Sequence, residues 1–346
     1  MYISRRSQGF RMEIHSKAPV RISFGGGGTD VSPYTEEHGG CVVSAAINKY
    51  AWGSIQIRKD GAIHLADSYN DITFKSALDI HYGTEMDLLS AVVKNMHSTR
   101  SGVNIRLRND VPPRSGLGSS ASAFAALIEL FNHMRRESRM TDYEIAELAY
   151  TLERQELKNK GGRQDQYASV FGGINYIEFR GEDFVRVNPV RMKRDHLLEL
   201  EKNLLLVHVM DRSKSGDIIS EQINSYVSGK REVVEAIHKV KALAEETHRA
   251  LRKGDLNRFG ELLHEGWVEK KKFTPLMSNQ HIDKLYEKAR KHGAIGGKIN
   301  GAGGGGHMIL YCECGREEDV ARVFTEAGST VRSFSFDMQG LQSWEV

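Results

Sequence analysis

The chain has 346 residues, with 48 Lys and Arg against 45 Asp and Glu, and a formal net charge of +3. This length suits two domains with sizeable cores, and the charges lack the basic stripe that is typical of nucleic-acid-binding proteins. No apolar run approaches the ~18 residues of a membrane span, residues 1–11 do not resemble a signal peptide, and the three cysteines form no disulfide framework or zinc-site spacing. We therefore expect a cytoplasmic protein with no nucleic-acid or membrane partner, and the sequence leaves open whether residues 1–11, before Met12, belong to the native protein.

The first half of the chain contains a strand-rich region interrupted by two helices. Alternating β-branched and apolar residues predict strands over 13–24, 41–57 and 102–109, and one or two further strands over 173–187. A helix that is apolar nearly all round is expected over 119–136. The sequence Thr141-Asp-Tyr-Glu144 is a capping box that opens a second helix to about residue 158.

The second half contains more helix. A charged stretch over 191–201 is expected to link two domains, residues 12–195 and residues 200–346. Within the second domain the patterns predict strands and helices in this order: strand 204–210, helices 216–228, 231–253, 255–272 and 281–292, strand 307–312, helix 317–327 and strand 330–337. Gly254 is expected to end the helix before it. Because strands and helices mix without regular βαβ alternation, the pattern favours an α+β fold.

Three glycine-rich loops lie at the start, middle and end of the chain. Residues 112–121 read Pro-Pro-Arg-Ser-Gly-Leu-Gly-Ser-Ser-Ala and run straight into the apolar helix. A helix N-terminus offers unpaired N–H groups and a partial positive charge, so such a loop can hold a phosphate, with the serines capping the helix or reaching the phosphate or its magnesium. Residues 25–28 are four glycines followed by Thr29 and Asp30, and residues 296–306 contain seven glycines. Turns alone do not account for three such loops.

The loops do not match two common nucleotide-binding motifs. No Gly-x-x-x-x-Gly-Lys-Ser/Thr sequence occurs, which excludes a P-loop NTPase. Gly301-x-Gly303-x-x-Gly306 matches the dinucleotide fingerprint but precedes a predicted strand. Gly116-x-Gly118-x-x-Ala121 precedes a helix, but a second helix follows where a Rossmann unit needs a strand. A nicotinamide-dependent oxidoreductase therefore remains only as an alternative.

The three motifs, in this order, resemble those of the GHMP small-molecule kinases. They are Ala-Pro-Val-Arg with the glycine turn ending in Thr-Asp (18–30), Pro-x-x-x-Gly-Leu-Gly-Ser-Ser (112–120) and Gly-Ala-Gly-Gly-Gly-Gly (301–306). Gly-Gly-Gly-Thr-Asp at 26–30 and Gly-Gly-Arg-Gln-Asp-Gln at 161–166 are similar to the heptose 7-phosphate kinases and, less closely, to the L-fucokinases. The resemblance implies an N-terminal half like domain 2 of ribosomal protein S5, a ferredoxin-like C-terminal half, and ATP bound between them.

The resemblance assigns the middle loop to ATP. The residues implied to bind it are Pro113, Arg114, Ser115, Gly116, Leu117, Gly118, Ser119, Ser120 and Ala121. Ser120 would also bind Mg²⁺. Glu153 lies four residues from both Ala149 and Leu157, on or beside the inward face of its helix, where an unpaired carboxylate is costly. Glu153 is therefore the expected second magnesium ligand, although Glu156 or a plain ion pair at Glu153 are alternatives.

The same resemblance assigns the catalytic and acceptor-binding residues. Asp165 would act as the base or orienting group for the acceptor hydroxyl, and Arg21 would face the acceptor and the γ-phosphate. The residues implied to contact the sugar are Gly27, Gly28, Thr29, Asp30, Gln164, Gly303 and Gly304. Arg212, Lys214 and Lys298 are candidates for an acceptor phosphate, although we expect each to be a surface or helix-end charge.

These assignments predict an ATP- and Mg²⁺-dependent kinase that phosphorylates the anomeric hydroxyl of a sugar phosphate, D-glycero-α-D-manno-heptose 7-phosphate. L-fucokinase or another hexose-1-kinase is an alternative within the enzyme class. A catalytically silent sugar or ATP sensor on the same fold is an alternative outside it, and the sequence leaves monomer and homodimer open.

Overall fold

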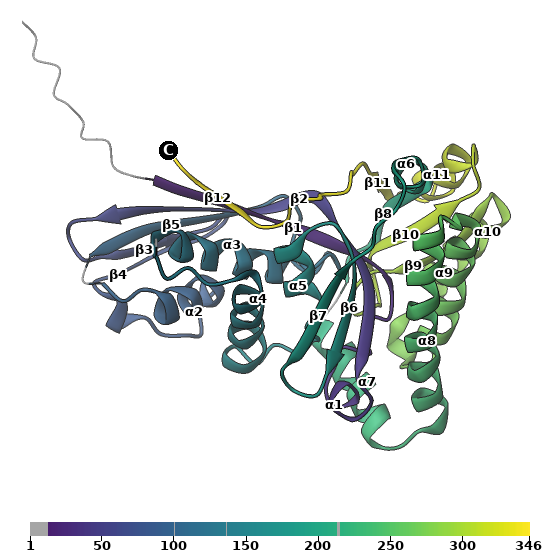
Figure 1. Cartoon of the computed structure of the whole chain (residues 1–346), viewed down its shortest axis with the longest axis horizontal. Coiled ribbons are helices and arrows are strands. Elements are labelled where there is room, and N and C mark those ends of the chain that lie inside the picture. Colours follow the sequence, from purple (N-terminus) through teal and green to yellow (C-terminus); the bar gives the residue numbers. More distant parts are fainter. Residues whose placement is uncertain (1–12, 100, 136, 213–214) are drawn as a thin grey trace, which may run out of the picture.

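The structure, a computed structural model, describes residues 13–99, 101–135, 137–212 and 215–346 and contains two β-sheets flanked by helices (Figure 1). The strands are β1 (Glu13–Gly25), β2 (Gly40–Arg58), β3 (Ile63–Ala66), β4 (Asp71–Phe74), β5 (Gly102–Asn109), β6 (Ile174–Arg180), β7 (Phe184–Pro189), β8 (Leu204–Met210), β9 (Ala294–Ile299), β10 (Gly306–Cys312), β11 (Thr330–Arg332) and β12 (Gln342–Glu345).

The helices include one π-helical segment, η2 (Thr151–Glu156), and two short 3₁₀ turns, η1 (Ala77–Asp79) and η3 (Pro275–Met277). The α-helices are α1 (Tyr34–His38), α2 (Asp87–Met96), α3 (Ser119–Met134), α4 (Asp142–Tyr150), α5 (Gln164–Phe171), α6 (Arg194–Asn203), α7 (Ser215–Val227), α8 (Arg231–Lys253), α9 (Leu256–Lys270), α10 (Gln280–Lys291) and α11 (Glu317–Thr325).

The larger sheet has the order β12-β1-β2-β5-β3-β4, with β6 and β7 extending it from β2. Its core lies between one sheet face and the helices α2 to α5, and α3 packs directly against β1 and β2 (Figure 1). The long β1–β2 pair is antiparallel and carries Arg21 opposite Ala46, near the end of β1. This packing fixes the N-terminus of α3 beside the last residues of β1.

The smaller sheet has the order β11-β8-β10-β9, and all of its strand pairs are antiparallel. It shares a core with residues of α8, α9, α10 and α11, including the fully buried Trp267. The expected α+β class and two-domain architecture are therefore confirmed.

A third hydrophobic cluster joins the two halves. It contains Phe24 from β1, Leu117 from the loop before α3, Phe259 from α9 and Tyr311 from β10. The ring of Phe24 meets that of Phe259 edge-on, with centroids 5.0 Å apart. The two halves thus share a continuous apolar contact and hold the glycine-rich loops between them.

Several predicted elements are confirmed. The strands at 13–24, 41–57 and 102–109 correspond to β1, β2 and β5, and the apolar helix corresponds to α3. The Thr141–Glu144 capping box forms with both of its hydrogen bonds. Gly254 ends α8 in the left-handed conformation.

Other elements differ from the sequence pattern. The stretch over 191–201 still lies between β7 of the larger sheet and β8 of the smaller one, but it contains most of α6, which buries Leu200. Residues 294–299 form β9, where the glycines hid the strand pattern. The last predicted strand stops at Arg332, and residues 342–345 cross back to pair with β1 as β12. The division at residues 195–200 stays a prediction, and the topology adds the C-terminal strand to the first domain.

Candidate active site

The middle glycine loop forms a cradle at the N-terminus of α3. Gly118 is the residue before the helix and has a left-handed φ of 76°, and no side chain caps the helix. Because the serines do not cap it, the first N–H groups of α3 remain available to an anion. Gly116 packs so closely on the second domain that a Cβ there would lie 2.8 Å from the carbonyl oxygen of Asn300.

A cavity of about 460 Å³ opens in front of this cradle. Its lining includes the predicted residues Pro113, Arg114, Gly116, Gly118, Ser119 and Ser120. Ser115, Leu117 and Ala121 are buried in the loop and the helix, so that only their backbones could serve a ligand. The lining also includes three leucines, Leu88, Leu89 and Leu107.

The buried Arg21 and the partly buried Asp165 form an ion pair beside the cradle. Arg21 donates from Nε to Asp165 Oδ1 at 2.8 Å, and its Nη2 lies 2.6 Å from the same oxygen. Its Nη1 donates to the carbonyl oxygen of Gly116 at 2.7 Å. Asp165 lies in the first turn of α5, not in a loop, and a Cβ on Gly118 would lie 3.3 Å from its carboxyl carbon. The carboxylate is therefore fixed next to the cradle.

The first glycine loop forms a second, smaller cavity of about 80 Å³, which is lined by Gly27, Gly28, Asp30, Gln164 and Asp165. Asp30 accepts hydrogen bonds from the backbone N–H groups of Gly28 and Gln164, at 3.0 and 3.1 Å. Its carboxylate is thus held by the backbone while it faces the cavity.

Thr29 serves the loop itself. Its hydroxyl donates to the carbonyl oxygen of Cys41 and accepts from the N–H of the same residue, and its side chain is fully buried. Thr29 therefore holds the loop in position. Because no atom of its side chain is exposed, the predicted contact of Thr29 with the sugar has no support from this geometry.

Glu153 and Ser120 line the larger cavity together. Glu153 lies in the π-helical segment η2, is buried, and accepts a 2.7 Å hydrogen bond from Gln166 Nε2. Arg154 Nη1 approaches it at 3.4 Å. The alternative residue, Glu156, instead accepts hydrogen bonds from Tyr82 and Asn95 and does not line the cavity.

The third glycine loop closes the site from the second domain. Gly301 and Ala302 line both cavities, whereas Gly303 and Gly304 pack against Met277 and Leu276 and line neither. The predicted contact of Gly303 and Gly304 with the acceptor therefore has no support from their positions. Asn300 accepts a hydrogen bond from the backbone N–H of Ser23, which fixes this loop against β1.

His307 anchors the cradle to the smaller sheet. Its backbone N–H and its ring Nδ1 both bond the carbonyl oxygen of Ser115, at 3.1 and 2.8 Å. Burial lowers the pKa of His307 to about 4, so the ring is neutral near pH 7. The anchor therefore does not titrate in the physiological range.

Lys298 is buried and Arg212 is partly buried, contrary to the expectation of surface or helix-end charges. Lys298 donates to the carbonyl oxygen of Ser23 and does not line either cavity, and burial lowers its pKa well below the ordinary value. Arg212 lines the larger cavity. Lys214 lies outside the described residues.

Lys270 is a functional candidate that the sequence did not reveal. It stands in a run of lysines at the end of α9, a pattern typical of an exposed helix end. Its side chain is buried, lines the smaller cavity, and donates to the carbonyl oxygen of Gly301 at 2.8 Å. Burial lowers its pKa to about 8; Arg21 and Arg212 lower it further, whereas Asp30 and Asp165 act in the opposite direction.

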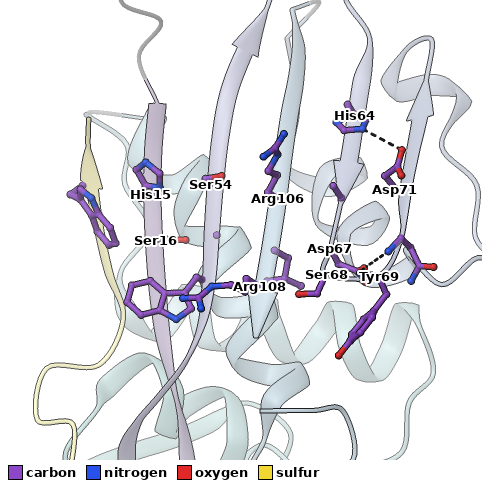
Figure 2. Close-up of a pocket in the computed structure, with 16 residues that line it drawn as sticks. His15, Ser16, Ser54, His64, Asp67, Ser68, Tyr69, Asp71, Arg106 and Arg108 are labelled. Atoms are coloured by element: carbon purple, nitrogen blue, oxygen red, sulfur yellow. Dashed lines mark hydrogen bonds and ion pairs between the residues drawn. The ribbon is translucent and has the colours of Figure 1, made fainter. Parts of the chain in front are cut away.

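A further cavity, of about 710 Å³, lies on the outer face of the larger sheet (Figure 2). There His15, Ser54 and Arg106 stand in register across β1, β2 and β5. None of the residues predicted from the motifs lines this cavity. One face of an antiparallel sheet is commonly left in water, so the junction of the two halves remains the candidate active site.

Comparison with known proteins identifies the family. The GHMP kinases N terminal domain matches residues 87–173, and the GHMP kinases C terminal domain matches residues 247–330. The chain is 31% identical over 339 residues to D-glycero-alpha-D-manno-heptose 7-phosphate kinase from Campylobacter jejuni, and the match covers 96% of this chain and 99% of the relative. The chain belongs to the GHMP kinase superfamily.

Other relatives of this GHMP kinase agree with that assignment. A solved structure named D-glycero-D-manno-heptose 1-phosphate kinase from Bacteroides thetaiotaomicron has a TM-score of 0.80 and 32% identity, and the match covers 96% of this chain and 99% of that one. The bifunctional fucokinase/GDP-fucose pyrophosphorylase of Arabidopsis thaliana is 26% identical over 85% of this chain, which spans 29% of that protein.

These matches make this GHMP kinase an ATP-dependent phosphotransferase with a hydroxyl group as acceptor, within the sugar kinases. Among the described residues, no helix is long and apolar enough to cross a membrane.

Proposed function

We propose that this kinase transfers the γ-phosphate of ATP to the anomeric hydroxyl of D-glycero-α-D-manno-heptose 7-phosphate, giving the 1,7-bisphosphate for nucleotide-activated heptose synthesis. The observation that carries the proposal is the buried cation Lys270 in the smaller cavity. It donates a hydrogen bond to a backbone carbonyl, and within the part of the chain that the structure describes it forms no ion pair with a carboxylate. Asp30 and Asp165 are close enough to raise its pKa but form no direct ion pair with it, and a buried charge without such a pair is costly. The phosphate of the acceptor would supply the direct partner.

ATP occupies the larger cavity in this proposal. Its phosphates lie on the N–H groups at the start of α3, among Gly116 to Ser120, where the helix dipole favours negative charge. Its base lies toward Leu88, Leu89 and Leu107, which offer an apolar surface.

Glu153 and Ser120 fit a magnesium ion at the phosphates. Both present oxygen atoms, the donors that Mg²⁺ prefers, and both line the cavity. The described residues hold no cluster of three or more His, Cys, Asp or Glu side chains suited to a metal. This pattern matches the usual magnesium site, in which one or two protein ligands are completed by substrate phosphates and water. The ion would neutralise charge on the phosphates.

The acceptor lies in the smaller cavity, with its hydroxyls near Asp30 and Gln164 and its reacting oxygen facing Asp165. Asp165 accepts the proton of the anomeric hydroxyl as the oxygen bonds to the γ-phosphorus. The bond from that phosphorus to the β–γ bridging oxygen breaks, and its electron pair stays on ADP. Arg21 keeps the Asp165 carboxylate oriented throughout.

A coupled ADP-release assay with Mg-ATP tests the proposed acceptor. The panel contains heptose 7-phosphate, heptose 1-phosphate, L-fucose, galactose and mannose, because relatives are named for both heptose phosphates and for fucose. We expect kcat/KM for heptose 7-phosphate to exceed that of the free hexoses by about 10- to 100-fold, since a charge-assisted contact contributes about 1.5–3 kcal/mol. Equal or better turnover of L-fucose would contradict the proposal and favour the fucokinase alternative. ATP binding without turnover of any sugar would favour the silent sensor.

A further inference from the structure

The second domain supplies a partly buried arginine to the ATP cavity. Arg212 lies two residues after the end of β8 and lines the larger cavity together with Gly116, Gly118, Ser119 and Ser120. A Cβ on Gly301 would lie 3.4 Å from its Nη1, which places the guanidinium beside the loop that closes the site.

The donors of Arg212 are unused. Within the described residues, its Nε and Nη1 are buried and have no hydrogen-bond partner. Arg21 contrasts with it, because the Nε and Nη2 of Arg21 are taken by Asp165 and its Nη1 by Gly116. Of these two cations, Arg212 is therefore the one with N–H groups free for a ligand.

The surroundings of Arg212 favour an anion. Burial, together with the nearby Arg21 and Arg114, lowers its pKa to about 10, while Asp165 acts in the opposite direction. The side chain remains charged at neutral pH and lies in a mostly cationic environment. A phosphate would relieve both the lost solvation and the repulsion.

We infer that Arg212 binds the γ-phosphate of ATP and stabilises it during transfer, while Arg21 positions Asp165. The step remains the one described above, in which the hydroxyl proton goes to Asp165 and the bridging electron pair goes to ADP. Arg212 neither gains nor loses a proton. It only neutralises charge on the transferring group. The inference rests on the proposed ATP site but not on the identity of the sugar.

Kinetics of Arg212→Ala and Arg212→Lys test this role, with Arg322→Ala as control because Arg322 is exposed on α11. We expect Arg212→Ala to lower kcat by about 10²- to 10³-fold, as for loss of one transition-state donor. Added guanidinium should restore at least part of the rate, and Arg212→Lys should be intermediate. A kcat within threefold of the wild type would overturn the inference. The inference would also be overturned by a defect that is confined to the KM of a phosphorylated acceptor and is absent with the unphosphorylated sugar.

Nucleotide binding gives a second readout that needs no acceptor. Calorimetry with Mg-ATP and Mg-ADP should show that Arg212→Ala weakens ATP binding about tenfold more than ADP binding, since the γ-phosphate alone loses its contact. Equal weakening of both nucleotides would indicate a structural role and overturn the inference. If no sugar in the panel reacts, the proposed acceptor fails while this comparison still decides the role of Arg212. If Arg212→Ala does not fold, the same comparison is made on Arg212→Lys.

Discussion

At the scale of single residues, Asp165 depends on Arg21 for its position. The two side chains come from β1 and α5, and their ion pair holds the carboxylate beside Gly118. Asp165→Asn keeps the shape but cannot take the hydroxyl proton, so we expect kcat to fall by about 10²- to 10⁴-fold, the usual contribution of general-base catalysis. ATP binding measured by calorimetry should change little. An Asp165→Asn enzyme with wild-type kcat would exclude Asp165 as the base.

Lys270 gives the site a dependence on pH. Burial lowers its pKa from 10.5 to about 8, so the free enzyme loses this charge as the pH rises through 8. If Lys270 binds the acceptor phosphate, kcat/KM for the phosphorylated sugar falls above pH 8, and Lys270→Met removes that fall. Lys288→Met is the matched control, because Lys288 is half-exposed and lines neither cavity.

A change in folding stability would not explain a fall in kcat/KM above pH 8. The unfolded chain holds a proton on this lysine up to about pH 10.4, whereas the folded chain releases it near pH 8. Between these values the unfolded state binds more protons, so the contribution of Lys270 to the free energy of unfolding increases with pH. An unchanged pH profile in Lys270→Met would contradict its role in binding.

At the scale of elements, the segment between η2 and α5 holds the first glycine loop. Gly162 lies so close to Asp30 that an added Cβ would overlap its carboxylate. Gly162→Ala therefore displaces Asp30, and we expect the KM of the acceptor to rise about tenfold, the effect of about 1.4 kcal/mol, while the KM of ATP stays within twofold. Steady-state kinetics in both substrates check this.

Gly266 provides the matched control for that substitution. It lies inside α9, and an added Cβ would meet open space. Gly266→Ala should leave both KM values unchanged and raise the stability of the protein by up to about 1 kcal/mol. Equal kinetic effects of the two substitutions would argue against a specific role for the Gly162–Asp30 contact.

At the scale of the whole molecule, the third hydrophobic cluster couples the two halves. Phe259 is fully buried between Phe24 of the first sheet and Tyr311 of the second. We expect one cooperative unfolding transition in calorimetry, and a loss of about 3–5 kcal/mol in Phe259→Ala. Phe184→Ala, at a partly exposed position on β7, should cost less than about 1 kcal/mol. Two separate transitions in the wild type would show that the halves unfold independently.

The sequence by itself determined the features that depend on local pattern. The phosphate cradle followed from glycines and serines placed before an apolar helix, and the Thr141 capping box and the Gly254 helix end followed from residue type and spacing. The resemblance to the GHMP kinases assigned Asp165 and Arg21, and with the inward helix face Glu153, to one site, and all three side chains line the larger cavity.

Only the tertiary structure decided which cations face those cavities. Lys270 and Arg212 look like ordinary surface charges in the sequence, and Gly303 and Gly304 look like members of the closing loop. The sequence pattern also did not predict the strands β9 and β12. Glycines interrupt the pattern of β9, and β12 pairs with β1 at the other end of the chain. The physical reason is that burial, desolvation and charge proximity arise from contacts between segments that are far apart in the chain, whereas periodicity and capping arise from neighbouring residues.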